Sequence, residues 1–355
     1  MLPVQTLLQK IAEGARPSVE ELVHLLNSSD ETGDRIFAAA RDITRKIHGD
    51  EIHLRGIIEF SNHCRNSCHY CGIRMGASGV KRYRMTPDEI LEAAYIVRDS
   101  GCGTVVLQSG VDPAFRTGDI AKIVAAVKKE TGMAVTLSIG TKTKQKLKLL
   151  KDAGADRFLL RFETCNEKIF NRIHPNEPLS ARLEGLENLR CLNYQTGSGF
   201  MIGLPGATLE DIAEDILFTK KLHLDMIGCG PFIPAPDTPL SGESLLKNDA
   251  IYFRTMALIR MMNPDAHIPA ATAFDSLRDG GRNEVLKCGA NVFMPNFTPL
   301  QYKVNYNLYP GKSKVDTSVD IREDVRKRIE SLGRKPGTGP GHALRIAEQS
   351  VPEAE

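Results

Sequence analysis

No segment of the sequence approaches the roughly 18 to 20 consecutive apolar residues that a membrane-spanning helix requires, so we expect no membrane partner. The N-terminal stretch "MLPVQTLLQKIAEG" carries polar and charged residues and lacks the apolar core of a signal peptide. Charge of one sign is not in excess either, because 46 basic and 44 acidic residues leave a formal charge of +2. These absences argue against an acidic membrane or a nucleic acid as partner, and they predict a cytoplasmic protein.

Cysteine is also sparse, with eight residues in 355, yet three of the eight fall within "SNHCRNSCHYCG", Ser61 to Gly72. In a reducing compartment cysteines rarely form structural disulfides, which favours metal binding or redox chemistry for this group. The composition, 41% apolar and 25% charged, is that of an ordinary protein with a large core. The other cysteines are scattered: Cys102, Cys165, Cys191, Cys229 and Cys288.

The first fifty residues have the three- and four-residue apolar spacing of helices, and "EIHLRGIIEF" then reads as a strand. A helix is predicted over "MTPDEILEAAYIVRDSG", with Thr86 as N-cap, Pro87 and Glu89 in its first turn and Gly101 past its end. The alternation of strand and helix then recurs along the chain.

Counting from Glu51 gives about eight strands over roughly 250 residues, the rhythm of a (βα)8 TIM barrel. A doubly wound parallel sheet is the competing α/β architecture. We divide the chain into an N-terminal helical extension (1–50), the barrel (51–312) and a C-terminal helix and tail (313–355). The tail is rich in glycine and proline, and we expect it to be loosely attached.

The spacing C-x-x-x-C-x-x-C places Cys64, Cys68 and Cys71 on one tight loop directly after the first strand, at the end of a barrel where active sites lie. Three thiolates can hold a 4Fe-4S cluster and leave one iron open for a substrate or cofactor. The alternatives are a zinc site completed by His63 or His69, and three reduced cysteines without a ligand.

Two further motifs bear on a site. "LLRFET" ends the fourth strand with Arg161 and Glu163 on one face, which predicts that both point into the barrel. They form either part of a ligand site or a buried structural ion pair. The glycines of "TGSGFMIGLPG" do not fit the G-x-G-x-x-G spacing, so a dinucleotide-binding loop is not indicated.

With Tyr70 directly before the third cysteine, the motif resembles the radical S-adenosylmethionine (SAM) superfamily. Longer stretches resemble the HydE family of [FeFe]-hydrogenase maturases, which is related to biotin synthase and methylornithine synthase. These stretches are "FSNHCRNSCHYCGIR", "KRYRMTPDEI", "VVLQSGVDP", "AGADRFLLRFET", "TGSGFMIGLPGATLEDI", "GPFIPAPDTPL", "CGANVFMPNFTP" and "YNLYPGK".

The resemblance implies a 4Fe-4S cluster and S-adenosylmethionine as cofactors, with reductive cleavage of the latter to a 5′-deoxyadenosyl radical. It implies a substrate that is a cysteine-containing iron carbonyl and cyanide complex, used in assembly of the dithiomethylamine ligand of the hydrogenase H-cluster. It also implies partner maturases and an electron donor such as ferredoxin or flavodoxin.

By resemblance, residues of two kinds surround the cluster cysteines. Those on the cofactor side are Tyr70, Gly110, Ser138, Glu163, Arg182, Met201 and Tyr302. Those on the substrate side are Thr136, Arg161, Thr272, Met294 and Tyr306. A purely structural role is the alternative for two of them. Gly110 can be required by the backbone angles of the turn, and Met294 can be a core side chain.

Three features depart from the family pattern. Phe162 replaces a histidine that some members carry, and Ala271 stands where threonine is frequent beside Thr272; both are expected to touch the substrate side. "SKVDTSVDI" lacks the cysteines of an accessory cluster. Two alternatives to a maturase therefore stay open, an amino-acid mutase of the methylornithine synthase type and a non-catalytic iron–sulfur scaffold.

Overall fold

The computed structural model describes residues 3–243, 245–314, 316 and 320–349. Its centre is a ring of parallel strands in the order β7-β5-β4-β3-β2-β1-β10-β9. Two backbone hydrogen bonds of 2.9 Å close the ring, from Ile227 N to His267 O and from His267 N to Asp225 O. The (βα)8 barrel is confirmed and the doubly wound sheet is wrong. The ring strands are β1 (Glu51–Ser61), β2 (Thr104–Ser109), β3 (Ala134–Ser138), β4 (Arg157–Leu159), β5 (Gln195–Ser198), β7 (Met226–Ile227), β9 (Pro269–Ala270) and β10 (Val292–Phe293).

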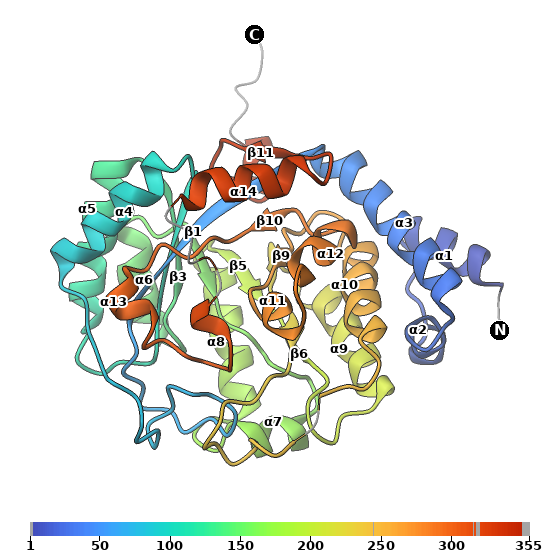
Figure 1. Ribbon diagram of the computed structural model, residues 1–355, viewed down its shortest axis with the longest axis horizontal. Helices are drawn as coiled ribbons and strands as arrows, with labels where there is room; N and C mark the ends of the chain where they lie inside the picture. The colour runs from blue at the N-terminus through green and yellow to red at the C-terminus, as the bar shows by residue number, and fades with distance from the viewer. Residues whose placement is uncertain (1–2, 244, 315, 317–319, 350–355) are drawn as a thin grey trace, which may run out of the picture.

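Helices alternate with these strands and cover the outside of the barrel (Figure 1). The predicted cap of the first of them is present: Thr86 and Glu89 bond reciprocally as a capping box. Within the described residues, no helix combines the length and apolar character that crossing a membrane requires. The helices are α4 (Pro87–Asp99), α5 (Thr117–Thr131), α6 (Lys144–Asp152), α7 (Glu167–Ile173), α8 (Leu179–Cys191), α9 (Leu209–Lys221), α10 (Ala250–Met262), α11 (Ala273–Leu277), α12 (Gly281–Lys287), α13 (Leu300–Lys303) and α14 (Ile321–Glu330); the short strands β6 (Met201–Ile202) and β8 (Gly230–Pro231) pair separately.

The N-terminal helices lie along one side of the barrel, beside α9 and α10 (Figure 1). Arg254 of α10 fastens them: its guanidinium donates to the Leu26 carbonyl at 3.1 Å and pairs with Asp30 at 2.9 Å. The helices predicted for the first fifty residues are therefore present and bonded to the barrel. They are α1 (Val4–Ala12), α2 (Val19–Leu26) and α3 (Asp30–His48).

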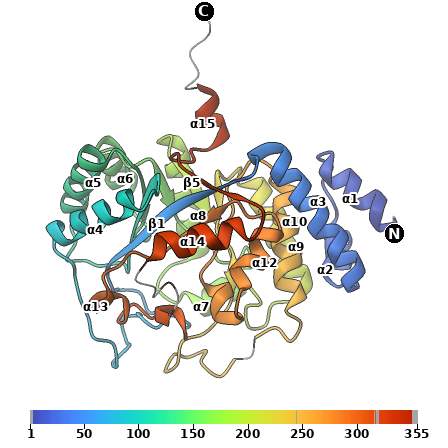
Figure 2. The same ribbon diagram turned by 45° about the horizontal axis from the view of Figure 1, so that its top comes forward.

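From Lys335 to Ala343 the tail is bonded to the barrel, which corrects the expectation of loose attachment drawn from its glycine and proline content; residues 350–355 lie outside the described residues. Strand β11 (Lys335–Gly337) pairs in parallel with the start of β1, opposite Glu51 to His53. The chain then crosses the strand-start end of the barrel and continues into α15 (Leu344–Gln349), as Figure 2 shows. The proposed division at Lys312 stays a prediction.

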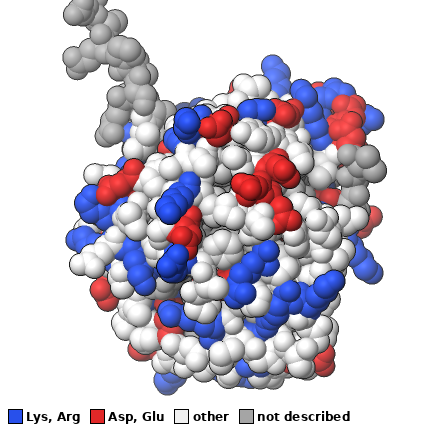
Figure 3. All heavy atoms as spheres, turned by 90° about the vertical axis from the view of Figure 1, so that its left-hand side faces the viewer, with Lys and Arg blue, Asp and Glu red and all other residues white. Residues whose placement is uncertain are grey.

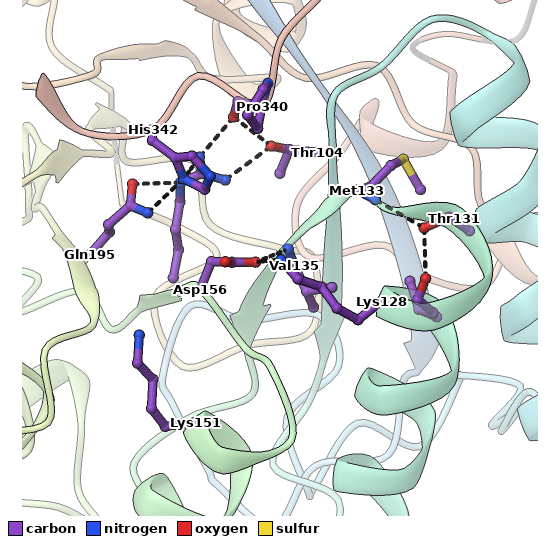
Figure 4. A network of polar contacts seen from close by, with 12 residues as sticks. Thr104, Lys128, Thr131, Met133, Val135, Lys151, Asp156, Gln195, Pro340 and His342 are labelled. Atoms are coloured by element: carbon purple, nitrogen blue, oxygen red, sulfur yellow. Dashed lines mark hydrogen bonds and ion pairs between the residues drawn. The ribbon is translucent and has the colours of Figure 1, made fainter. Parts of the chain in front are cut away.

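Hydrogen bonds explain why this segment stays in place. Arg157, which is fully buried, donates to the carbonyls of Pro340 at 2.7 Å and Gly341 at 2.8 Å. Gln195 Nε2 lies 2.8 Å from His342 Nδ1, and Figure 4 shows Pro340 and His342 held at the starts of the strands. A buried guanidinium needs such partners, which keeps the segment in place. The segment lies across the end of the barrel where the strands begin, which we call the barrel floor.

Partly buried histidines beside this floor predict a loss of stability in acid. Burial, and then the charge of Arg260, lowers the pKa of His48 from 6.5 to about 3, and burial lowers the pKa of His53 to about 4. As the pH falls below about 6.5 the unfolded chain takes up protons that the folded protein does not bind, so the free energy of unfolding falls by a few kcal/mol by about pH 4.5. Urea unfolding across this range measures the loss, and His53→Gln should reduce the slope. A pH-independent stability would contradict the account.

Candidate active site

The three-cysteine loop follows β1 and leaves the barrel at the carboxyl ends of its strands, at the lower edge of Figure 1. Two glycines let other chain segments approach it. A Cβ on Gly110 would lie 2.3 Å from the His63 carbonyl and 2.8 Å from Cys64 Cβ, and one on Gly72 would lie 2.0 Å from the Asn307 carbonyl. Gly110 is thus needed for close approach, whereas its φ is not positive, so the expected reason based on backbone angles is wrong.

The cysteine thiols are free and only partly exposed. Burial raises the pKa of Cys71 to about 12, and burial followed by the neighbouring Cys71 and Cys64 raises the pKa of Cys68. Among the described residues, no three His, Cys, Asp or Glu side chains converge as ligands of a single metal ion. A zinc site built with His63 or His69 therefore has no preformed geometry here. A 4Fe-4S cluster binds each thiolate at a different iron and does not need that convergence.

Arg161 and Glu163 follow β4 and form an ion pair, with Nη2 and Oε2 2.9 Å apart. Alternation along the strand predicts that they share one face, and a structural ion pair is the alternative to a ligand site. Glu163 is buried and has a positive φ of 66°, a sparsely populated conformation for a residue with a side chain. Arg182 on α8 donates to the Arg161 carbonyl at 2.9 Å and pairs with Glu177. Tyr70 lies on the other side, with its hydroxyl 3.5 Å from Glu163 Oε1.

Several polar atoms of this region are buried without a hydrogen bond. They belong to Arg161 (Nε and Nη2), Glu163 (Oε2) and Thr136 (Oγ1). Arg161 Nη2 and Glu163 Oε2 form an ion pair, but the geometry of this pair is not that of a hydrogen bond. Unsatisfied buried donors and acceptors cost about 1 to 3 kcal/mol each, so the incompletely bonded Arg161 and Glu163 side chains fit a polar ligand that supplies further partners.

A second buried ion pair, not selected from the sequence, lies near the end of β1, just before the cysteine loop begins. Glu59 at the end of β1 pairs with Lys312 and also accepts from Asn296 Nδ2 at 3.1 Å. Lys312 Nζ lies 5.1 Å from the ring centre of Tyr306, which is buried. This places Tyr306 beside fixed charges, and the only sequence signal was the lysine of "YPGK".

The remaining predicted residues divide by location. Ser138 ends β3 two residues beyond Thr136, and Met201 is buried in an apolar group against which Tyr70 packs. The structure does not bring Tyr302 to the others: its hydroxyl donates to Glu89 at 2.6 Å, and the helix that carries it, α13, ends at Lys303 before Tyr306. Thr272 precedes α11 and Met294 follows β10, and both are partly buried.

Phe162 does not touch the substrate side, which corrects the expectation for this departure. Its ring is fully buried and lies 5.1 Å from Phe218 of α9 and 5.9 Å from Phe200. Successive residues of an extended chain point to opposite faces, so Phe162 faces the helices while Arg161 faces inward. Ala271 packs against Gly230 of β8, with 3.5 Å between its Cβ and a Cβ built on that glycine.

A three-cysteine loop after the first strand of a closed parallel barrel, facing unsatisfied polar groups, defines a radical SAM enzyme, and residues 58–219 match the model of the radical SAM superfamily. The chain is 47% identical over 317 residues to "[FeFe] hydrogenase maturase subunit HydE" of Thermotoga maritima, covering 89% of this chain and 90% of that protein. It therefore belongs to the HydE family.

More distant relatives share the fold. The chain is 25% identical to 3-methylornithine synthase of Methanosarcina acetivorans, over 92% of this chain and 93% of that protein. A methylornithine synthase crystal structure superposes with a TM-score of 0.82 at 24% identity, covering 96% of this chain and 99% of that one. The hydrogenase maturase HydG superposes with a TM-score of 0.83 at 19% identity, covering 98% and 80%.

Radical SAM enzymes use a 4Fe-4S cluster and S-adenosylmethionine, and the residues of this site fit both. Cys64, Cys68 and Cys71 would hold the cluster, and the buried carboxylate of Glu163, already paired with Arg161, would accept hydrogen bonds from the nucleoside cofactor. When bound and reduced, the cluster would supply the electron for reductive cleavage of S-adenosylmethionine. The closed wall of the barrel would keep water away from this chemistry.

Proposed function

We propose that this radical SAM enzyme acts in assembly of the hydrogenase H-cluster, on a cysteine-containing iron complex with carbonyl and cyanide ligands. The observation that carries the proposal is the 47% identity to a HydE maturase along nearly the whole chain, against 25% to methylornithine synthases. The buried donors of Arg161, two of which lack hydrogen bonds, support an anionic substrate.

We assign the polar residues of the site to two groups, one that binds the cofactor and one that binds the substrate. Glu163, Arg182 and Tyr70 lie together near the cysteine loop, on the cofactor side. Arg161 and Thr136 present their unsatisfied atoms to the substrate. Thr272, Met294 and Tyr306 complete the substrate pocket, and Gly110, Ser138 and Met201 stay assigned to the cofactor side. Tyr302, whose hydroxyl donates to Glu89, is assigned to neither ligand.

Product analysis after anaerobic turnover tests the substrate assignment. With strong reductant and S-adenosylmethionine, the iron complex should increase formation of 5′-deoxyadenosine, whereas lysine should not yield a rearranged amino acid. Rearrangement of lysine would instead identify a mutase of the methylornithine synthase type. A protein that binds no S-adenosylmethionine in a titration would be the non-catalytic scaffold.

We also propose that a small acidic electron carrier, such as a ferredoxin or flavodoxin, docks on the face that carries the cysteine loop. From residue 60 to 87 the sequence has five basic residues and no acidic one. Arg65 and Lys144 line one hollow of about 670 Å³ beside this loop, and basic side chains are prominent on the lower half of the face in Figure 3. Complementary charge raises the rate of such encounters. The reduced thiols favour a cytoplasmic location.

Charge reversal tests this docking face. Lys81→Glu and Lys144→Glu change exposed side chains and should together raise the KM for the reduced carrier about three- to tenfold at low salt. The rate with dithionite should not change, because a small reductant needs no docking surface. Lys10→Glu, on α1 away from this face, is the matched control. An equal effect with dithionite, or an equal effect of the control, would refute the assignment.

A further inference from the structure

His174 is a buried residue beside the cysteine loop that is assigned to neither the cluster, the cofactor nor the substrate. His174 directly follows α7, is 5% exposed, and donates its backbone N–H to the Phe170 carbonyl at 2.8 Å. Its imidazole stacks on the Phe170 ring, with 4.9 Å between ring centres and 20° between planes. The ring orientation is therefore fixed by packing and by the backbone.

Both ring nitrogens have partners from the cysteine loop. Nδ1 lies 3.3 Å from the Cys68 sulfur, and Nε2 lies 3.3 Å from the Tyr70 hydroxyl. Two further hydrogen bonds fix the cysteine loop against the end of α7 and the residues after it. His69 N donates to the Ile173 carbonyl at 3.0 Å, and Ser67 N donates to Asn176 Oδ1 at 2.7 Å. The end of α7 thus holds the loop at consecutive residues around Cys68.

The chemistry of the partners assigns the proton. A cysteine that ligates iron is a thiolate and can only accept, so the nitrogen facing it must carry the hydrogen. Nε2 of the neutral ring then accepts from the Tyr70 hydroxyl, which is able to donate. The opposite tautomer would direct a lone pair at the sulfur. Second-shell groups fix a ligand and its electronics in this way.

We propose that His174 is a positioning residue that donates Nδ1–H to the Cys68 sulfur and raises the reduction potential of the cluster. A hydrogen bond to a ligating sulfur stabilises the more negative, reduced state. The same ring joins Cys68 to Tyr70, whose hydroxyl also lies 3.5 Å from Glu163 Oε1. The inference rests on the cluster assignment but is independent of the substrate.

Three substitutions at His174 distinguish the effect of the N–H donor to sulfur from the effect of the aromatic ring. His174→Asn keeps an N–H group near the position of Nδ1, His174→Gln keeps one near Nε2 and loses the donor to sulfur, and His174→Phe keeps only an aromatic ring. Redox titration of the reconstituted proteins, followed by electron paramagnetic resonance, gives the midpoint potential. Iron and sulfide content of each variant is the control.

The Phe and Gln variants should shift the midpoint potential to more negative values, and the Asn variant should stay close to the natural protein. If the Phe variant loads less iron, the Asn variant should restore both loading and potential. Unchanged potentials at full iron content would overturn the proposal, as would an equal change in all three variants. Wild-type protein that loads no cluster would instead refute the cluster assignment.

Discussion

Replacement of Cys64, Cys68 or Cys71 by serine is expected to abolish formation of 5′-deoxyadenosine and to remove most of the bound iron. In a 4Fe-4S cluster each of the three thiolates would bind a different iron, so loss of one would leave an iron without its strong ligand. Partial burial of all three side chains leaves little solvent to substitute for the missing sulfur. Iron and sulfide analysis of anaerobically reconstituted protein, together with chromatography of the nucleoside product, measures both losses.

Cys191→Ser is the matched control, because Cys191 is exposed at the end of α8, away from the loop. It should keep the iron content and the activity of the natural protein. A loop variant with undiminished iron and activity would show that the cluster ligands lie elsewhere.

Gly110→Ala is expected to lose cluster binding nearly completely although it adds a single methyl group. The new Cβ would lie 2.3 Å from the His63 carbonyl and 2.8 Å from Cys64 Cβ, so the loop would have to move. The loop cannot yield locally, because Val111 N donates to the Cys64 sulfur and Arg65 N donates to the Val111 carbonyl at 3.0 Å. Absorbance of the reconstituted cluster and iron analysis measure the effect.

Gly118→Ala provides the comparison, since it lies in the first turn of α5 with no atom within 4 Å of the added Cβ. It should leave the cluster unchanged and stabilise the fold by about 0.5 to 1 kcal/mol. Circular dichroism should show the barrel intact in both variants. A Gly110 variant with a normal cluster would contradict the packing argument.

The barrel could be predicted because its information is local. Apolar residues repeat along the chain with the spacing of strands and helices in turn, and the capping-box residues Thr86 and Glu89 mark the start of helix α4. The cysteine loop could be placed for the same reason, since active-site loops follow the strands of such barrels. Alternation after β4 also predicts that Arg161 and Glu163 share one face, and their ion pair agrees with this.

The features that sequence could not give depend on contacts between distant segments. A tail rich in glycine and proline reads as loose, yet its carbonyls are the partners of the buried Arg157. Phe162 reads as part of a polar motif, but its ring packs on α9. His174 lies 106 residues from Cys68 in the chain, and only folding brings its imidazole to the sulfur.

The central claim is that three cysteines hold a cluster whose remaining iron binds S-adenosylmethionine. The most direct measurement is electron paramagnetic resonance of the reduced, anaerobically reconstituted protein before and after addition of S-adenosylmethionine. The account predicts a 4Fe-4S signal that changes on addition, because the nucleoside cofactor coordinates the open iron. A signal that is identical in both samples, or protein that holds zinc and no iron, would contradict it.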